Sequence, residues 1–312
     1  MIHSDKGHSK KNFVSKEVTL SLQKEENMEA YNRPLYKEII EGTYRQYTIP
    51  VYQRTYTWEK KQCKQLYDDI ISSIKSKRKH YLGSIVYSEK EANDEGEAFT
   101  FRQIIDGQQR LTSVILLLKA IYDSIPEEKN KIKIRIYNSL YNENCEERYK
   151  LKLQSIDNDN NELKNVLLNN LSNLNKLSNI SKNYYYFLDR IEESKKEKIS
   201  YEDLFKGICN LEIVEIKLDE KDKPQLIFES INSTGKGLTN AEKIRNFLLM
   251  GIMKSSKQKK YYEEYWEPLC SCIGSQNIET FFYDYLVMKD ISYIKGEELY
   301  DNFKNIIINK II

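Results

Sequence analysis

One helix constrains the fold of this chain more than any other segment. Apolar residues recur at helical spacing after residue 110, and two more leucines widen the apolar face. These residues are Leu111, Val114, Ile115, Leu118 and Ile121, with Leu116 and Leu117 beside them. A helix that is apolar over so much of its circumference must be covered on most sides. We therefore expect it at the centre of the fold.

Strands are expected on both sides of this helix in the sequence. Residues 80–88 and 99–105 are apolar, β-branched and aromatic, and a polar stretch separates them, which predicts a hairpin or sheet pair. Residues 211–218 predict another strand, and residues 131–137 and 149–154 predict two more. The sheet should therefore be mixed and should carry helices around it.

Helices are expected at residues 34–40, 59–76, 163–193, 224–231 and 240–253, and the chain is helical and aromatic from residue 261 onward. The expected fold class is α/β, of the α+β kind, with a helical C-terminal part. The expected domains are a polar tail (1–28), a main mixed domain (29–255) and a helical extension (256–312). The apolar run at residues 306–312 predicts either a chain that is truncated before a further domain or an end that contacts a partner.

Composition excludes several classes of protein. The chain has 49 Lys and Arg against 47 Asp and Glu, so its net charge of +2 gives no reason to expect a strongly basic, DNA-coating surface. A DNA contact would then be a local patch. An apolar run of about 18 residues is absent, so no membrane span is expected. Five scattered cysteines suit a reducing compartment, and we expect a cytoplasmic protein.

The first polar motif is IPVYQRTYTW, residues 49–58. A strand that ends in Gln53 and Arg54 can present an amide and a planar guanidinium fork to a phosphate. The alternative is a strand end whose arginine pairs with a carboxylate, while Tyr56 and Trp58 pack in the core.

The second motif is IIDGQQRLT, residues 104–112, in which a strand turns directly into the central helix. The first turn of a helix has free N–H groups that favour phosphate, and Gly107 lets the backbone approach closely. Gln108, Gln109 and Arg110 add donors, and Asp106 is a candidate to hold Mg²⁺ or to orient a water.

A structural alternative exists for this motif, since Asp106 and Gln109 have the spacing of a capping box. A cap needs neither Gln108 nor Arg110, however. An arginine at a helix N-terminus also gains nothing from the dipole unless an anion is present. This misfit favours a functional role.

The third motif spans residues 228–239. Thr239 and Glu242 predict a capping box for the helix that follows. The loop before it offers Asn232, Gly235 and Lys236 to a ligand. It is not a Walker P-loop, because Ser230 stands where that motif needs a glycine.

The three motifs, together with Tyr81-Leu82-Gly83-Ser84-Ile85, resemble the N-terminal family of GmrSD restriction endonucleases, also called the DGQQR domain. They occur in the family's order over residues 34–246. The family is similar to the ParB/sulfiredoxin fold. The resemblance implies NTP binding and hydrolysis that control cleavage of modified DNA.

The resemblance also implies roles for particular residues. Tyr52, Gln53 and Arg54 would line the nucleotide site, and Asn232, Gly235 and Lys236 would close it. Its phosphate and hydrolysis centre would comprise the following residues: Asp106, Gly107, Gln108, Gln109 and Arg110. The expected cofactor is Mg²⁺, with NTP as the substrate. The preferred base and the oligomeric state are left open.

The chain departs from the family in one respect. Many members carry an HNH nuclease domain, whose chemistry needs histidines. The histidines here are His3, His8 and His80, so none lies in the C-terminal half. We therefore expect the nuclease on another subunit or on a domain that this chain does not contain.

Two other functions are alternatives to NTP hydrolysis. A non-hydrolysing switch would bind nucleotide and gate a DNA partner. A Mg²⁺-dependent nuclease would use Asp203, Glu215 and Lys217, although such patterns arise easily by chance in a charged chain. The basic clusters at residues 75–79 and 254–260 are candidate DNA contacts, but such runs are more often solvated helix ends.

Overall fold

The computed structural model describes residues 30–42, 44–94, 97–126, 130–155, 159–219, 222, 224–232, 238–252, 255–289 and 298–311. It has an α+β fold around one six-stranded mixed sheet, as the sequence predicts. Within the described residues, no helix is long and apolar enough to cross a membrane.

The strands of the sheet follow the order β1-β6-β3-β4-β2-β5. Their bounds are β1 Ala30–Pro34, β2 Arg45–Ile49, β3 His80–Asp94, β4 Glu97–Asp106, β5 Leu153–Ser155 and β6 Leu211–Leu218. The central pair β3 and β4 is antiparallel, as predicted, and so is the edge pair β1 and β6. Strand β6 runs parallel to β3, and β2 runs parallel to both β4 and β5.

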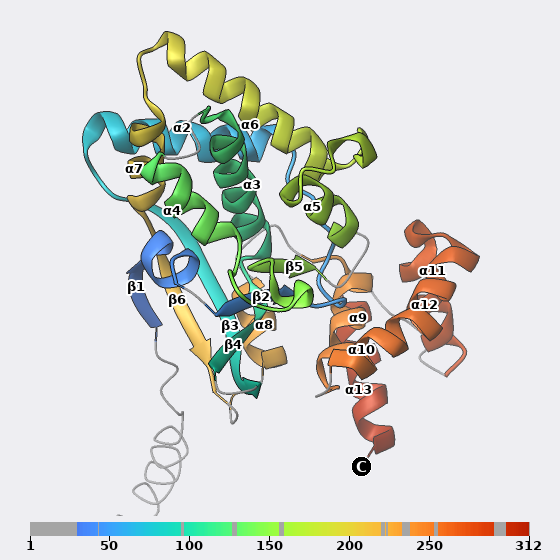
Figure 1. Cartoon of the computed structure of the whole chain (residues 1–312). Coiled ribbons are helices and arrows are strands. Elements are labelled where there is room, and N and C mark those ends of the chain that lie inside the picture. The colour runs from blue at the N-terminus through green and yellow to red at the C-terminus, as the bar shows by residue number, and fades with distance from the viewer. Residues whose placement is uncertain are drawn as a thin grey trace, which may run out of the picture.

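Six of the described helices cover one face of this sheet. These are α2 Lys60–Ser76, α3 Gln108–Ser124, α4 Lys131–Leu140, α5 Asp159–Leu167, α6 Asn179–Lys196 and α7 Tyr201–Cys209. Figure 1 shows α3 surrounded by its neighbours, and every residue from Leu111 to Ile121 is buried. The predicted central position of this helix is therefore confirmed.

The remaining helices lie below and beside the sheet in Figure 1. They are α8 Pro224–Asn232, α9 Asn240–Met250, α10 Ser255–Tyr261, α11 Glu267–Ile273, α12 Ile278–Val287 and α13 Leu299–Ile311. Helices α9, α12 and α13 share an apolar cluster that includes Ile244, Trp266 and Phe282. The rings of Trp266 and Phe282 stack at 6.0 Å between centroids.

The two faces of the sheet are buried by different layers because side chains alternate along a strand. Ile104 belongs to the main core beneath the helices α2–α7. Its neighbour Ile105 belongs to a second cluster with Val86 and with Phe228 of α8. The last residues of β4 before Asp106 are thus fixed from both faces.

The prediction of a strand at residues 131–137 is wrong, because this segment is helix α4. Ile132, Ile134 and Ile136 alternate like a strand, but Ile134 is 49% exposed and Ile136 is buried. Asn130 accepts hydrogen bonds from the backbone N–H groups of Ile132 and Lys133, which caps a helix.

The prediction of one continuous helix over residues 163–193 is also wrong. Helix α5 ends at Leu167, and Asn169 has a left-handed φ of 59°. Helix α6 begins after Ser178, whose hydroxyl caps the N–H of Ile180. The strand predicted at residues 149–154 is only partly formed, because β5 begins at Leu153.

Candidate functional site

Gln109 joins the first two motifs. Its side-chain nitrogen donates to the carbonyl of Thr55 at 3.0 Å. Its side-chain oxygen accepts the backbone N–H groups of Thr57 at 2.8 Å and Trp58 at 3.2 Å. The residue is only 7% exposed. The start of α3 therefore holds the C-terminal part of the first motif by three hydrogen bonds.

Two more glutamines add to this connection. Gln108 donates to the carbonyl of Arg54 at 3.0 Å. From the first motif, Gln53 donates back to the carbonyl of Ile105 at 2.7 Å. Both side chains are buried. Motifs that lie about fifty residues apart in the sequence thus satisfy each other's backbone groups, as buried polar groups require.

The polar groups that remain accessible gather where β4 turns into α3. Arg110 forms an ion pair with Asp106, at 2.6 Å between Nη2 and Oδ2. The hydroxyl of Ser84, on the neighbouring strand β3, donates to the same carboxylate oxygen at 3.3 Å. We call Ser84, Asp106 and Arg110, with the first turn of α3, the β4–α3 corner.

Two glycines allow this close packing. A β-carbon on Gly83 would lie 2.2 Å from Nη1 of Arg110, so only a glycine leaves room for the guanidinium. A β-carbon on Gly107 would lie 2.8 Å from the carbonyl oxygen of Ser84. Both glycines have positive φ, 120° and 93°, which side chains other than hydrogen rarely tolerate.

The capping box proposed for Asp106 and Gln109 is not formed. Gly107 is the N-cap residue, and the side chains of Asp106 and Gln109 have the other partners given above. The anion that Arg110 needs at the helix N-terminus is the carboxylate of Asp106. The arginine is therefore neutralised within the chain.

The other predicted residues of the first motif differ in exposure. Tyr52 is 2% exposed, and its hydroxyl accepts a hydrogen bond from Gln103. Burial raises its pKa, so the phenol stays neutral. Arg54 is half-buried, and among the described residues its guanidinium has no hydrogen bond or ion pair. Arg54 is thus the cation of this motif that is available to a ligand.

The third motif is anchored on the same part of the sheet. Phe228 and Leu238 pack in the cluster that contains Ile105, the residue before Asp106. The capping box of Thr239 and Glu242 is confirmed. Asn232 lies in α8, although the description does not extend to its side chain, and Gly235 and Lys236 lie outside the described residues.

The residues of the nuclease alternative have separate contacts. Asp203 caps α7 with Ser200, Glu215 accepts from Tyr87 at 2.6 Å, and Lys217 pairs with Glu89. The described residues contain no group of three or more His, Cys, Asp or Glu that could hold a metal ion. The structure therefore does not bring this set together.

Two functional candidates were not predicted as site residues, although both belong to a quoted motif. Ser84 and Gly83 follow a register shift of β3 against β6, which pairs Tyr81 with Glu212 and Gly83 with Ile213. Such bulges re-aim side chains next to functional sites. The pair Gly-Ser in a predicted strand is the signal that could have indicated them.

The fold and the corner define an α+β protein whose polar motifs meet at one strand–helix turn. A family model described as the GmrSD restriction endonuclease N-terminal domain matches residues 34–249. The chain belongs to this family, which makes it a component of a restriction system. A comparison with curated proteins finds no match.

Proposed function

We propose that this chain is the NTP-binding and NTP-hydrolysing module of a DNA restriction system. One observation carries the proposal: a guanidinium, a carboxylate, a hydroxyl and a helix N-terminus meet at the accessible β4–α3 corner. Catalysis of phosphoryl transfer depends mainly on positioning and on stabilising charge, and these groups supply both. The family supports a role in restriction.

Arg110 and Arg54 would hold phosphates, together with the N–H groups of the first turn of α3. The amide nitrogens of Gln108 and Gln109 are occupied by the carbonyls of Arg54 and Thr55. We therefore assign these glutamines to positioning Arg54 rather than to direct phosphate contact. Asn232, Gly235 and Lys236 remain proposed as the residues that close the site.

Asp106 fits a magnesium ion that phosphates help to hold. Among the described residues, its contacts from Ser84 and Arg110 fall on Oδ2, so Oδ1 is the atom that we propose for a metal. Magnesium commonly takes one or two carboxylates and completes its shell with phosphate oxygens and water. When bound, the ion would neutralise charge that develops on the phosphates.

A switch without turnover is the second candidate, because the ion pair Asp106–Arg110 must loosen before a phosphate can take the guanidinium. Binding alone would then rearrange the corner and signal to a partner. In either case we propose that the nuclease is a separate subunit or domain, that the DNA is modified, and that the protein works in the cytoplasm.

The test is phosphate release from ATP, GTP, CTP and UTP with Mg²⁺, with and without DNA that carries modified bases. Arg110→Ala and Asp106→Ala should each lower turnover at least 100-fold. Arg190→Ala is the matched control, because Arg190 also forms a helical ion pair and is similarly exposed, 26% against 23%. Nucleotide binding without turnover would favour the switch, and no binding would refute both candidates.

A further inference from the structure

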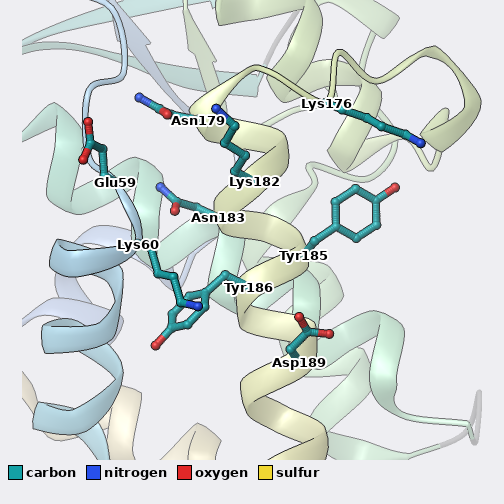
Figure 2. A pocket seen from close by; sticks show the side chains of 9 residues that line it. All are labelled: Glu59, Lys60, Lys176, Asn179, Lys182, Asn183, Tyr185, Tyr186 and Asp189. Atoms are coloured by element: carbon teal, nitrogen blue, oxygen red, sulfur yellow. The ribbon is translucent and has the colours of Figure 1, made fainter.

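A cavity lies on the helical side of the molecule, apart from the β4–α3 corner. It measures about 650 Å³, within the usual range of small-ligand sites, and lies between the start of α2 and the N-terminal half of α6. Figure 2 shows its nine lining residues: Glu59, Lys60, Lys176, Asn179, Lys182, Asn183, Tyr185, Tyr186 and Asp189. We call this cavity the α2–α6 groove.

The groove carries cations that the chain does not neutralise. Within the described residues, the amino groups of Lys60, Lys176 and Lys182 form no ion pair. Glu59 also lines the groove, but its carboxylate accepts a backbone N–H in the capping box of α2. Asp189 lies at the opposite end from Lys182, two helical turns or about 10 Å away (Figure 2).

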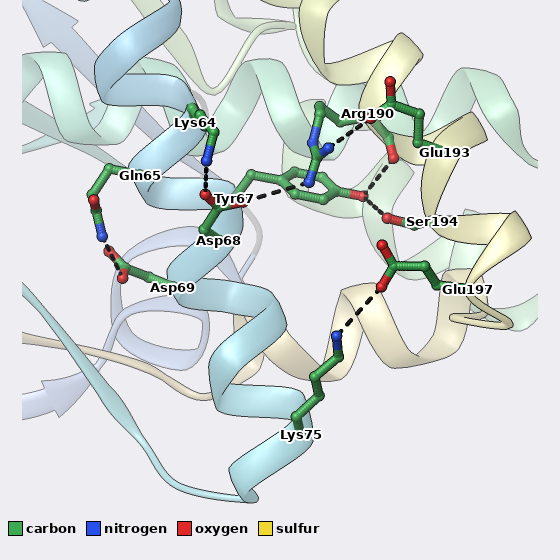
Figure 3. Close-up of polar contacts among 10 residues, drawn as sticks. All are labelled: Lys64, Gln65, Tyr67, Asp68, Asp69, Lys75, Arg190, Glu193, Ser194 and Glu197. Carbon is green, nitrogen blue, oxygen red and sulfur yellow. Dashed lines mark hydrogen bonds and ion pairs between the residues drawn. The ribbon is translucent and has the colours of Figure 1, made fainter.

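The cations further along the same two helices show a contrast. There the cations have partners, as Figure 3 shows: Lys64 with Asp68, Arg190 with Asp68 and Glu193, and Lys75 with Glu197. These cations are neutralised within the chain, whereas the three amino groups of the α2–α6 groove are available to an anion. The start of α2 and the start of α6 both lie there and add partial positive charge.

The groove also offers surfaces for a planar ring. Tyr185 is 41% exposed, and Tyr186 is half-buried with the amino group of Lys60 5.4 Å from its ring centre. Tyr185 and Tyr186 lie one helical turn after Lys182, so an anion at Lys182 brings an attached ring to them. Aromatic side chains stack on nucleobases of any sequence.

Asn183 adds a hydrogen-bond acceptor inside this cationic groove. It is 1% exposed, and its nitrogen donates to the carbonyl of Trp58 at 2.7 Å and to the hydroxyl of Tyr56 at 3.2 Å. Within the described part of the chain, its Oδ1 has no hydrogen-bond partner. An acceptor placed among lysines suits a ligand that carries both negative charge and an N–H donor.

We propose that the α2–α6 groove binds a nucleoside phosphate, with the phosphate at the lysines and the base at the two tyrosines and Asn183. The ligand is either a free nucleotide or a nucleotide of a DNA strand. The groove is connected to the β4–α3 corner, since Asn183 holds Trp58 and Gln109 accepts the backbone N–H of the same residue. This second site extends the proposed function without depending on it.

The first experiment measures hydrogen exchange of residues 179–186 and calorimetric binding for the full chain. The ligands are ATP, AMP, a 5′-phosphorylated single-stranded oligodeoxynucleotide and inorganic phosphate. Lys60→Gln combined with Lys182→Gln should weaken nucleotide binding about tenfold and remove the protection. Tyr185→Ala should weaken the binding of nucleotides but not the binding of inorganic phosphate.

The matched control combines Lys64→Gln with Lys195→Gln, which removes one paired lysine from each of the same helices and should leave binding unchanged. Protection by mononucleotides identifies a free nucleotide as the ligand, and protection by the oligonucleotide alone identifies a DNA strand. No protection of residues 179–186 would overturn the proposal, and so would equal affinity for nucleotides and inorganic phosphate. Arg110→Ala should keep this protection even if hydrolysis is never observed.

Discussion

Gly83 on β3 lies directly against Arg110 of α3: a β-carbon on Gly83 would lie 2.2 Å from the guanidinium nitrogen Nη1. The arginine therefore takes its place beside Asp106 because the neighbouring strand has no side chain there. This contact can be tested without substituting Arg110 or Asp106.

We expect Gly83→Ala to displace Arg110 and to reduce turnover nearly as much as Arg110→Ala. The φ of 120° adds strain, so the free energy of unfolding should also fall by about 1–3 kcal/mol. Turnover and urea unfolding measure the two effects. Gly251→Ala is the control, because its φ is −65° and its nearest neighbour is 4.0 Å away. Unchanged turnover in Gly83→Ala would contradict the role of Arg110.

Gln109→Ala should lower the free energy of unfolding by about 3 kcal/mol, because it removes three part-buried hydrogen bonds to the backbone of Thr55, Thr57 and Trp58, each worth about 1 kcal/mol. Thermal and urea unfolding measure this loss. Gln65→Ala is the control. Gln65 is exposed, and among the described residues its side chain donates to Asp69, so its effect should stay within about 0.5 kcal/mol. Similar effects of both substitutions would refute the stabilising role of the Gln109 hydrogen bonds.

Lys152 predicts a pH dependence of stability. It is buried, its amino group donates to the carbonyls of Gly42 and Asn138, and burial, with the charge of Arg45, lowers its pKa to about 8. The unfolded chain then binds the proton more tightly than the folded one. This group's contribution to stability is complete above about pH 10.4 and is lost as the pH falls to about 8.

The stability of the wild type relative to Lys152→Met should therefore rise by about 3 kcal/mol between pH 8 and pH 10.4, since one pH unit corresponds to about 1.4 kcal/mol. Urea unfolding at several pH values, compared between the two proteins, removes the contributions of other groups. Lys150→Met, at a more exposed position, is the control for removing a lysine from this segment. If the free energies of unfolding of wild type and Lys152→Met changed in parallel with pH, a lowered pKa of Lys152 would be ruled out.

Ile244 tests the C-terminal apolar cluster. It is fully buried there, so Ile244→Ala should lower the free energy of unfolding by about 2–5 kcal/mol. Ile308→Ala on α13, 38% exposed, should lower it by less than about 1 kcal/mol. Urea unfolding followed by tryptophan fluorescence suits this test, because Trp266 lies in the same cluster.

Much of the fold was predictable, because periodicity reports burial directly. The alternation in β6 and the apolar circumference of α3 gave the right elements. Helix α4 was not predicted, since Ile132, Ile134 and Ile136 alternate by chance and only the packing shows which one is buried.

The candidate site was predictable only in part. Motif spacing indicated that Asp106 and Arg110 stand at a strand–helix turn, and the structure places them there. The partners of Gln108 and Gln109 could not be predicted, because they are backbone groups of a loop about fifty residues away. The position of Ser84 depends on the register of β3, which sequence does not reveal.

The burial of Ile104 and Ile105 on opposite faces has a mechanical consequence. Neighbouring residues of one strand touch the helical core above the sheet and the layer with Phe228 below it, and Asp106 follows at once. Close-packed layers cannot shift without opening voids or clashes. A displacement of α8 would therefore also displace the carboxylate of Asp106. The β4–α3 corner is in this way mechanically coupled to the opposite side of the sheet.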